Sequence, residues 1–154
     1  MADTPRGIAA ATYVETTEGP VQMGETPNKG FPVLTRFADG RLGFRQLIKV
    51  TVADDVALVR VVLESWFGVV VAGGHPFFRA DGSSIPAERL SAGDLLDTAF
   101  HYREGYVPDG ATRPVPGVSV AVRAVEPAGR GQVLTGTVRD THALFLTAGV
   151  LCAE

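Results

Sequence analysis

Two histidines in this sequence stand where an imidazole could perform acid–base chemistry. The first, His75, lies between a glycine pair and a proline in VAGGHPFFRADG (residues 71–82). The apolar run before it, residues 59–71, is rich in β-branched side chains and predicts a strand pair that ends in a turn. Such a turn would hold the ring rigidly beside backbone groups. Taken alone, however, these residues favour a histidine that only serves the turn.

The second histidine, His142, stands beside Asp140 and Thr141 in VRDTHALFLTAGVLC (residues 138–152), just before another apolar strand. A neighbouring carboxylate can orient an imidazole and favour its charged form, as general acid–base catalysis requires. Aspartate and threonine also satisfy the free backbone groups of turns. Taken alone, this segment favours the turn.

Other catalytic signals are weak. The chain contains no GxSxG motif, which disfavours a serine hydrolase, and GETPNKG (residues 24–30) lacks the Gly-Lys-Ser/Thr of a phosphate loop and predicts a hairpin loop. His75, His101 and His142 do not have metal-ligand spacing, and Cys152 is the single cysteine. We therefore expect neither a metal nor a cofactor.

Composition narrows the class of protein. A chain of 154 residues has the length of one domain, and 45% hydrophobic with 20% charged residues is typical of a soluble globular protein. No apolar run approaches the roughly 20 residues that cross a bilayer, and the first residues do not resemble a secretory signal. With a net charge of −3, the chain lacks the excess of basic residues that binds the phosphate backbone of a nucleic acid. We expect a monomeric, cytoplasmic protein that binds neither membrane nor nucleic acid.

The elements that must position the histidines are short apolar segments separated by Gly, Pro and Asp, a pattern that predicts an all-β fold. Only residues 85–90, with Pro86 in the first turn, suggest a helical turn. Residues 104–117 contain three prolines and three glycines and predict a surface loop. The predicted strands cover residues 11–17, 31–37, 44–53, 56–64, 67–71, 94–100, 118–127, 132–139 and 143–152.

Taken in order, the motifs resemble those of the hedgehog/intein (Hint) family of self-processing domains. That family begins with a Cys or Ser seven residues before a V-x-T-x-x-G strand, a form that GIAAATYVETTEG (residues 7–19) shares apart from the first residue. Its middle motif, Thr-x-x-His-Pro-Phe followed by a D-G turn and L-x-x-G-D, is similar to residues 72–96. Its last motifs are similar to VRDTHALF (residues 138–145) and GVLCAE (residues 149–154). The resemblance covers essentially the whole chain.

The resemblance implies a compact, pseudo-symmetric all-β horseshoe that brings the two chain ends together. It implies one domain over residues 7–154, an N-terminal flank at residues 1–6, and a shortened insertion site at residues 104–117. In the family, a first-residue thiol or hydroxyl attacks the preceding carbonyl with help from the Thr-x-x-His imidazole. A terminal His-Asn pair then cyclises to release the downstream segment. The partners implied are the flanking polypeptide segments in cis.

Several catalytic positions of the family are changed in this chain. Glycine has no nucleophile, alanine cannot donate a proton, and a glutamate carboxylate cannot form the succinimide that asparagine forms. We therefore expect an intein-like domain that has lost splicing but retains supporting residues. The family's nucleophile, motif Thr and terminal His-Asn fall on Gly7, Ala72, Ala153 and Glu154, whereas its histidines and acid are retained as His75, Asp140 and His142.

Two other functions stay open. In the first, the domain retains non-standard cleavage through His75 and His142, with Cys152 as the only available thiol. We expect Cys152 instead to be a small buried residue of the last strand. In the second, only the fold is kept and the chain is a binding module that uses residues 104–117 or the Phe77–Phe78 pair. Core packing of one of these two rings is the ordinary outcome.

Overall fold

The computed structural model describes residues 5–28, 31–99, 107 and 119–154. Within these ranges almost every element is a strand, which confirms the all-β prediction. The strands are β1 (Ile8–Ala9), β2 (Tyr13–Thr16), β3 (Gly19–Gln22), β4 (Pro32–Arg36), β5 (Leu42–Leu63), β6 (Gly68–Ala72), β7 (Pro76–Phe78), β8 (Ser84–Pro86), β9 (Leu95–Asp97), β10 (Ser119–Val138), β11 (Ala143–Phe145) and β12 (Leu151–Ala153). The 3₁₀ helices η1 (Met23–Asn28) and η2 (Ala87–Arg89) complete the described elements.

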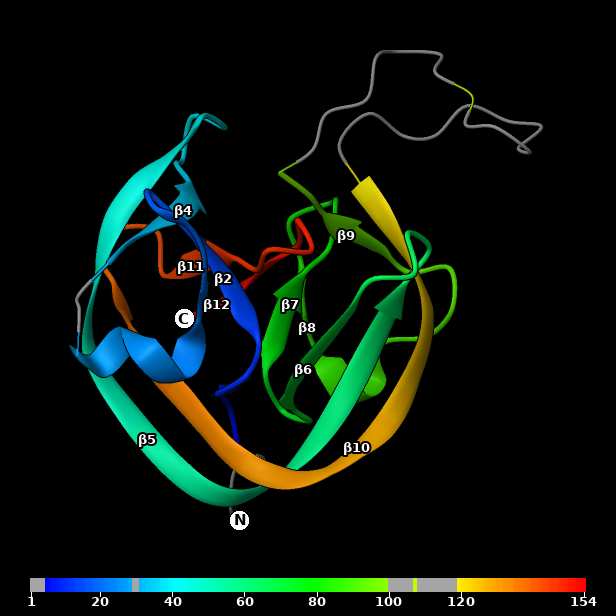
Figure 1. Cartoon of the computed structure of the whole chain (residues 1–154). Helices are drawn as coiled ribbons and strands as arrows, with labels where there is room; N and C mark the ends of the chain where they lie inside the picture. The colour runs from blue at the N-terminus through cyan, green and yellow to red at the C-terminus, as the bar shows by residue number, and fades with distance from the viewer. Residues whose placement is uncertain (1–4, 29–30, 100–106, 108–118) are drawn as a thin grey trace.

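Two long strands, β5 and β10, form the frame of the molecule. They pair antiparallel from Leu63↔Val122 to Leu47↔Val138 and curve together along one side of the structure (Figure 1). Strands β2, β3 and β4 extend the sheet from the first part of β5, whereas β6 pairs with its last part and β1 lies between β6 and β10. The long strands therefore join two lobes into one horseshoe. The first, N-terminal lobe contains β2, β3 and β4, and the second lobe contains β1, β6 and β9.

The prediction of two separate strands in each of these regions was wrong. Residues 44–53 and 56–64 both belong to β5, and residues 118–127 and 132–139 fall almost entirely within β10. The expected turns are bends: Asp55 has a φ of 54°, Gly129 has a φ of 77°, and the register shifts beside it. Aspartate and glycine tolerate these angles, so the strand bends as a β-bulge does while pairing continues.

Three smaller predictions also needed correction. The expected hairpin loop at residues 24–30 is largely helix η1, in which the Thr26 hydroxyl donates to the Met23 carbonyl at 2.8 Å. The single strand expected at residues 143–152 is a hairpin, β11 and β12, whose turn contains Gly149 at a φ of 94°. The strand expected at residues 94–100 is shorter, being β9 alone. The helical turn at residues 85–90 is confirmed as η2.

A second sheet, in the order β11-β12-β7-β8, packs inside the frame and carries the C-terminal end of the chain. Phe77 of β7 and Phe145 of β11 are fully buried and are the largest side chains of the core. The expected loop at residues 104–117 and His101 lie outside the described residues, apart from Val107. No helix in the described part of the chain is long and apolar enough to span a membrane.

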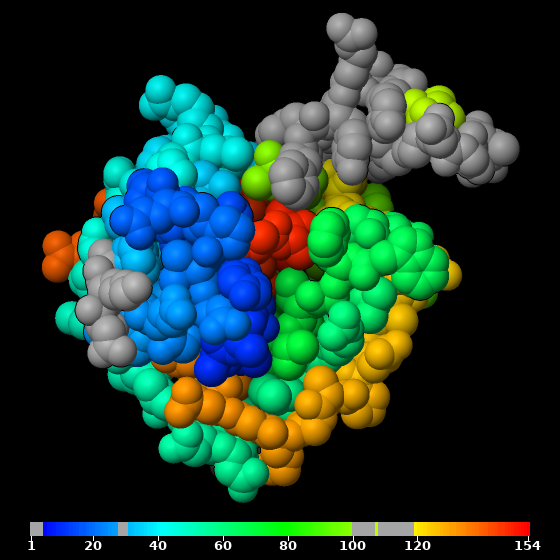
Figure 2. Space-filling view, in the orientation of Figure 1, coloured from blue at the N-terminus to red at the C-terminus, as the bar shows by residue number. Residues whose placement is uncertain are grey.

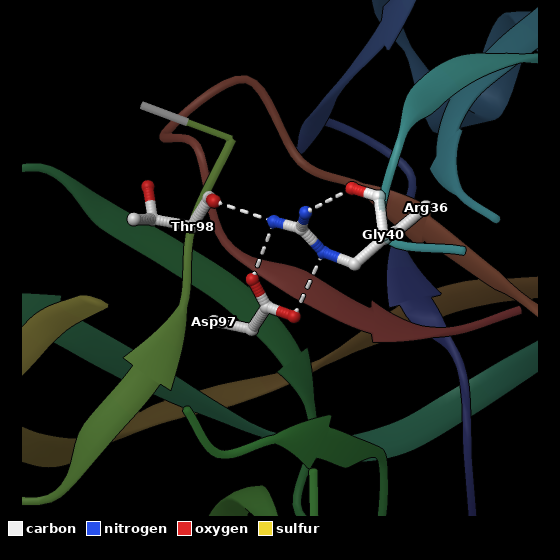
Figure 3. Close-up of polar contacts among 4 residues, drawn as sticks. All are labelled: Arg36, Gly40, Asp97 and Thr98. Carbon is white, nitrogen blue, oxygen red and sulfur yellow. Dashed lines mark hydrogen bonds and ion pairs between the residues drawn. The ribbon is translucent and has the colours of Figure 1, made fainter. Parts of the chain in front are cut away.

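An ion pair between Arg36 and Asp97 joins strand β4 to strand β9 (Figure 3). Arg36 of β4 grips both carboxylate oxygens of Asp97 of β9, with Nε at 3.0 Å and Nη2 at 2.7 Å. The same guanidinium donates to the carbonyls of Gly40 and Thr98, each at 2.9 Å. The Arg36 and Asp97 side chains are only 18% and 19% exposed, so this bidentate pair is a braced contact rather than a loose surface one.

Candidate functional site

His75 stands in the turn between β6 and β7, and its position is held by backbone contacts on both sides. Its N–H donates to the Ala72 carbonyl at 3.0 Å, and its carbonyl accepts the Ala87 N–H of helix η2 at 2.9 Å. The ring is fully buried and meets Phe77 edge to face, with centroids 6.2 Å apart. The glycines before it and the proline after it thus place a rigid imidazole inside the molecule.

The backbone amide of Gly7 lies directly on this imidazole. The Gly7 N–H donates to His75 Nδ1 at 3.1 Å, and the Gly7 carbonyl accepts the Ala72 N–H at 2.9 Å. Because Nδ1 is the acceptor, the neutral ring carries its proton on Nε2. The Arg6–Gly7 peptide, which is the bond that the resemblance implies as the cleavage site, is therefore clamped between β6 and His75.

Burial sets the charge of this ring. Loss of solvation lowers the pKa of His75 to about 4, and the positive charge of Arg6 acts in the same direction, whereas the backbone of Ala153 favours the protonated form. At neutral pH His75 is consequently an uncharged acceptor for the junction amide. The ring is therefore affected both by Arg6, which precedes the amide that it binds, and by the backbone of Ala153 in β12.

The C-terminal end is held by a carboxylate. Strand β12 pairs Ala153 with Ala143, and the following residue, Glu154, accepts the Val138 N–H at 2.5 Å through Oε2. Its other oxygen, Oε1, lies 2.9 Å from Nδ1 of His142. The C-terminal residues, drawn in red, lie between the N-terminal lobe and the green β6–β7 region (Figure 2).

The retained acid of the late motif does not take this role. Among the described residues, the carboxylate that contacts His142 is that of Glu154, although Asp140 is the nearer residue in sequence. Asp140 instead lines a surface depression with Phe37, Arg41 and neighbouring residues. The His142 side chain is 65% exposed, so His75 and His142 occupy very different surroundings.

One structural contributor escaped the sequence analysis. Thr35 of β4 is fully buried, and its hydroxyl oxygen lies 2.8 Å from both the Thr141 hydroxyl and the Ala143 carbonyl. It anchors the segment that carries His142 to the first lobe. A lone threonine in an apolar strand gives no sequence signal of such a contact.

Apart from Glu154, the positions at which the resemblance implies a changed residue are apolar or lack a side chain. Gly7 has a φ of 138°, Ala72 is fully buried, and Ala153 is 5% exposed. Cys152 is buried in β12 opposite Phe77 and Leu144, and burial raises the pKa of its thiol far above the usual range. A thiol in this state is a core side chain, not a nucleophile. No three His, Cys, Asp or Glu side chains of the described residues are grouped so that they could hold a metal ion.

Solved structures with a similar fold include inteins and an intein-like domain. A variant of the Ssp DnaB mini-intein has a TM-score of 0.79 at 11% identity, and the match covers 100% of this chain and 96% of that one. The bacterial intein-like domain from Clostridium thermocellum gives 0.76 at 17% identity, with 97% and 99% covered. The DnaB intein from Synechocystis sp. PCC 6803 gives 0.74 at 13% identity, with 97% and 99% covered. No protein-family model and no curated protein sequence matches the chain.

Proposed function

We propose that this intein-fold domain holds its two junctions in the arrangement of a splicing domain without breaking either peptide bond. The observation that carries the proposal is the hydrogen bond from the Gly7 N–H to His75 Nδ1 at 3.1 Å. The scissile amide is positioned on the imidazole that would assist an acyl shift, yet the residue that must supply the nucleophile has no side chain.

The chemistry at the upstream junction stops at its first step. An N-to-S or N-to-O acyl shift forms a bond between a side-chain sulfur or oxygen and the Arg6 carbonyl carbon, and then breaks the bond from that carbon to the Gly7 nitrogen. Gly7 supplies no such atom. His75 can accept a hydrogen bond from the amide, but an acceptor by itself forms no acyl intermediate.

The downstream junction lacks its reactive group as well. Cyclisation requires a side-chain amide nitrogen that attacks the residue's own carbonyl carbon, and Glu154 carries a carboxylate instead. Both oxygens of that carboxylate are engaged, one with Val138 and one with His142. Glu154 therefore serves to fasten the C-terminal end, and the domain acts on its flanking segments as a fixed connection in cis.

Residual cleavage through Cys152 is the less favoured alternative. Its thiol is fully buried, and its raised pKa keeps it protonated at neutral pH. A binding role for the Phe77–Phe78 pair is weakened in the same way, because Phe77 is fully buried. Neither alternative rests on a contact comparable with the hydrogen bond from the Gly7 N–H to His75 Nδ1.

The test is to express the chain between two flanking tags and to follow intact mass over days, with and without an added thiol or hydroxylamine. We expect a single species of full mass, identical in behaviour to a matched His75→Ala variant. A fragment cut after Arg6 or after Glu154, present in the unaltered chain and absent from His75→Ala, would overturn the proposal.

A further inference from the structure

The backbone at Gly7 has a conformation that only glycine adopts readily. Its φ of 138° lies in the region that L side chains rarely occupy. A Cβ built on this backbone would lie 2.7 Å from both Cβ and Cγ2 of Val133, and 3.3 Å from the Leu134 carbonyl oxygen. These separations are far shorter than the 3.5–4.0 Å or so at which two carbon atoms pack.

Val133 has no room to move aside. It is 1% exposed and lies in β10, where it pairs with Ala9 while its neighbour Leu134 pairs with Ile8. The contact at Gly7 involves the Cβ of Val133, which is fixed by the strand, as well as the rotatable Cγ2. A change of rotamer would therefore leave half of the clash in place.

The same valine belongs to one buried cluster with Ala72, the other position of the upstream site at which the resemblance implies a changed residue. Val133, Val56 and Ala72 form one buried cluster, covered by Leu58. The resemblance assigns a threonine to the position of Ala72. The space beside the junction peptide, where the family carries a nucleophile and a hydroxyl, is thus filled by aliphatic side chains.

We infer that Val133 closes the nucleophile position, so that no residue with a side chain is accommodated at Gly7 while Val133 is present. Cysteine, serine and threonine all begin with a Cβ, and the Cβ is the atom that the valine excludes. The inference rests on the proposed function and extends it. The domain is inactive because Gly7 supplies no nucleophile and also because Val133 fills the space that a nucleophilic side chain would need. Replacement of the lost catalytic residues alone will not reopen the site.

A double-mutant cycle tests this packing without any catalytic readout. Gly7→Ala adds only the Cβ, and Val133→Gly removes both atoms that it meets; the equilibrium constant of unfolding is measured in urea for the parent, both single variants and the pair. Gly7→Ala should raise that constant in both backgrounds. We expect the factor by which it does so to be about tenfold smaller in the Val133→Gly background than in the parent. The backbone strain at Gly7 is common to both backgrounds and cancels.

Val56→Gly is the matched control, because it empties the same cluster without touching the added Cβ. In that background Gly7→Ala should cost as much as in the parent. Equal costs of Gly7→Ala with and without Val133 would overturn the inference. If Val133→Gly does not fold, Val133→Ala removes the Cγ2 contact alone, and partial relief is then expected where full additivity would again overturn it.

Cleavage of the tagged chain gives a second test of whether Val133 closes the nucleophile position. The tagged chain with Gly7→Cys, Ala72→Thr, Ala153→His and Glu154→Asn is compared with and without Val133→Gly, which removes both atoms that a side chain at position 7 would meet. Cleavage after Arg6 only when Val133 is replaced supports the inference, whereas cleavage with Val133 in place overturns it. The proposed function is judged separately, because it fails only if the unaltered chain is cut.

Discussion

His142 Nδ1 lies 2.9 Å from Glu154 Oε1, and the second oxygen of the same carboxylate accepts the Val138 N–H. Glu154 therefore links the end of β12 to the end of β10 and to the segment that follows it. One carboxylate thus makes two contacts, each with a different oxygen, and both hold the last residue of the chain in place. Under the proposed function, this structural contact stands where the resemblance implies the asparagine of the release step.

This contact predicts a local change in protection. Glu154→Ala removes the acceptor of the Val138 N–H, and we expect hydrogen exchange of that amide to accelerate by roughly tenfold or more. The matched control is Asp140→Ala, which removes the sequence-adjacent carboxylate and should leave Val138 unchanged. If Asp140→Ala accelerated exchange of the Val138 amide and Glu154→Ala did not, Asp140 rather than Glu154 would hold this amide, and the prediction would be wrong.

The buried thiol predicts chemical inertness. Because Cys152 is fully buried and its pKa is raised, a thiol reagent such as Ellman's reagent should not label the folded chain at pH 8. Labelling should appear with the unfolding transition in urea and reach one equivalent. Rapid labelling of the folded chain would return Cys152 to consideration as a nucleophile.

The bidentate pair between the lobes predicts a large difference between two arginines. Arg36→Leu leaves the Asp97 carboxylate half-buried without its partner, and we expect a loss of about 2–3 kcal/mol in the free energy of unfolding. Arg41 also contacts an aspartate, Asp39, at 2.7 Å, but these side chains are 81% and 51% exposed. Arg41→Leu should therefore cost about 0–1 kcal/mol. Equal losses in a urea titration would contradict the braced role of Arg36.

Sequence patterns predicted the fold class and the larger strands, but not how the strands connect. Aspartate and glycine in the middle of β5 and β10 give the same signal as a hairpin turn, and only long-range pairing distinguishes a bend from a reversal. The short strands β1, β3, β7 and β8 also escaped, since two to four residues are too few for a periodic pattern. Their formation depends on tertiary pairing.

The site divides in the same way. The flanking glycines and proline alone favoured a turn histidine, and only the family resemblance assigned His75 to the site; in the structure its Nδ1 accepts the Gly7 N–H at 3.1 Å. The partner of His142 was not predictable, because Glu154 is 12 residues away and reaches it only through the β11–β12 hairpin. The closure of the site by Val133 was equally hidden, because a buried valine in a strand has no distinguishing sequence signal.

The lowered pKa of His75 predicts that the free energy of unfolding depends on pH between about 6.5 and about 4. Burial lowers its pKa to about 4 in the folded chain, against 6.5 for an exposed imidazole. Between these values the unfolded chain binds more protons than the folded one, so the free energy of unfolding must fall as the pH falls from about 6.5 to about 4, and level off below. The gap between the two values corresponds to at most about 3 kcal/mol.

The measurement compares urea unfolding of the parent with that of His75→Gln from pH 7.5 to pH 3.5. His101, His142 and all carboxylates are common to both proteins, so the difference between the curves isolates His75. We expect the parent to lose stability relative to the variant across that window, because a protonated Nδ1 no longer accepts the Gly7 N–H. Parallel curves would mean that the ring is charged or solvated in the folded chain, and the clamp on the junction amide would then have no basis.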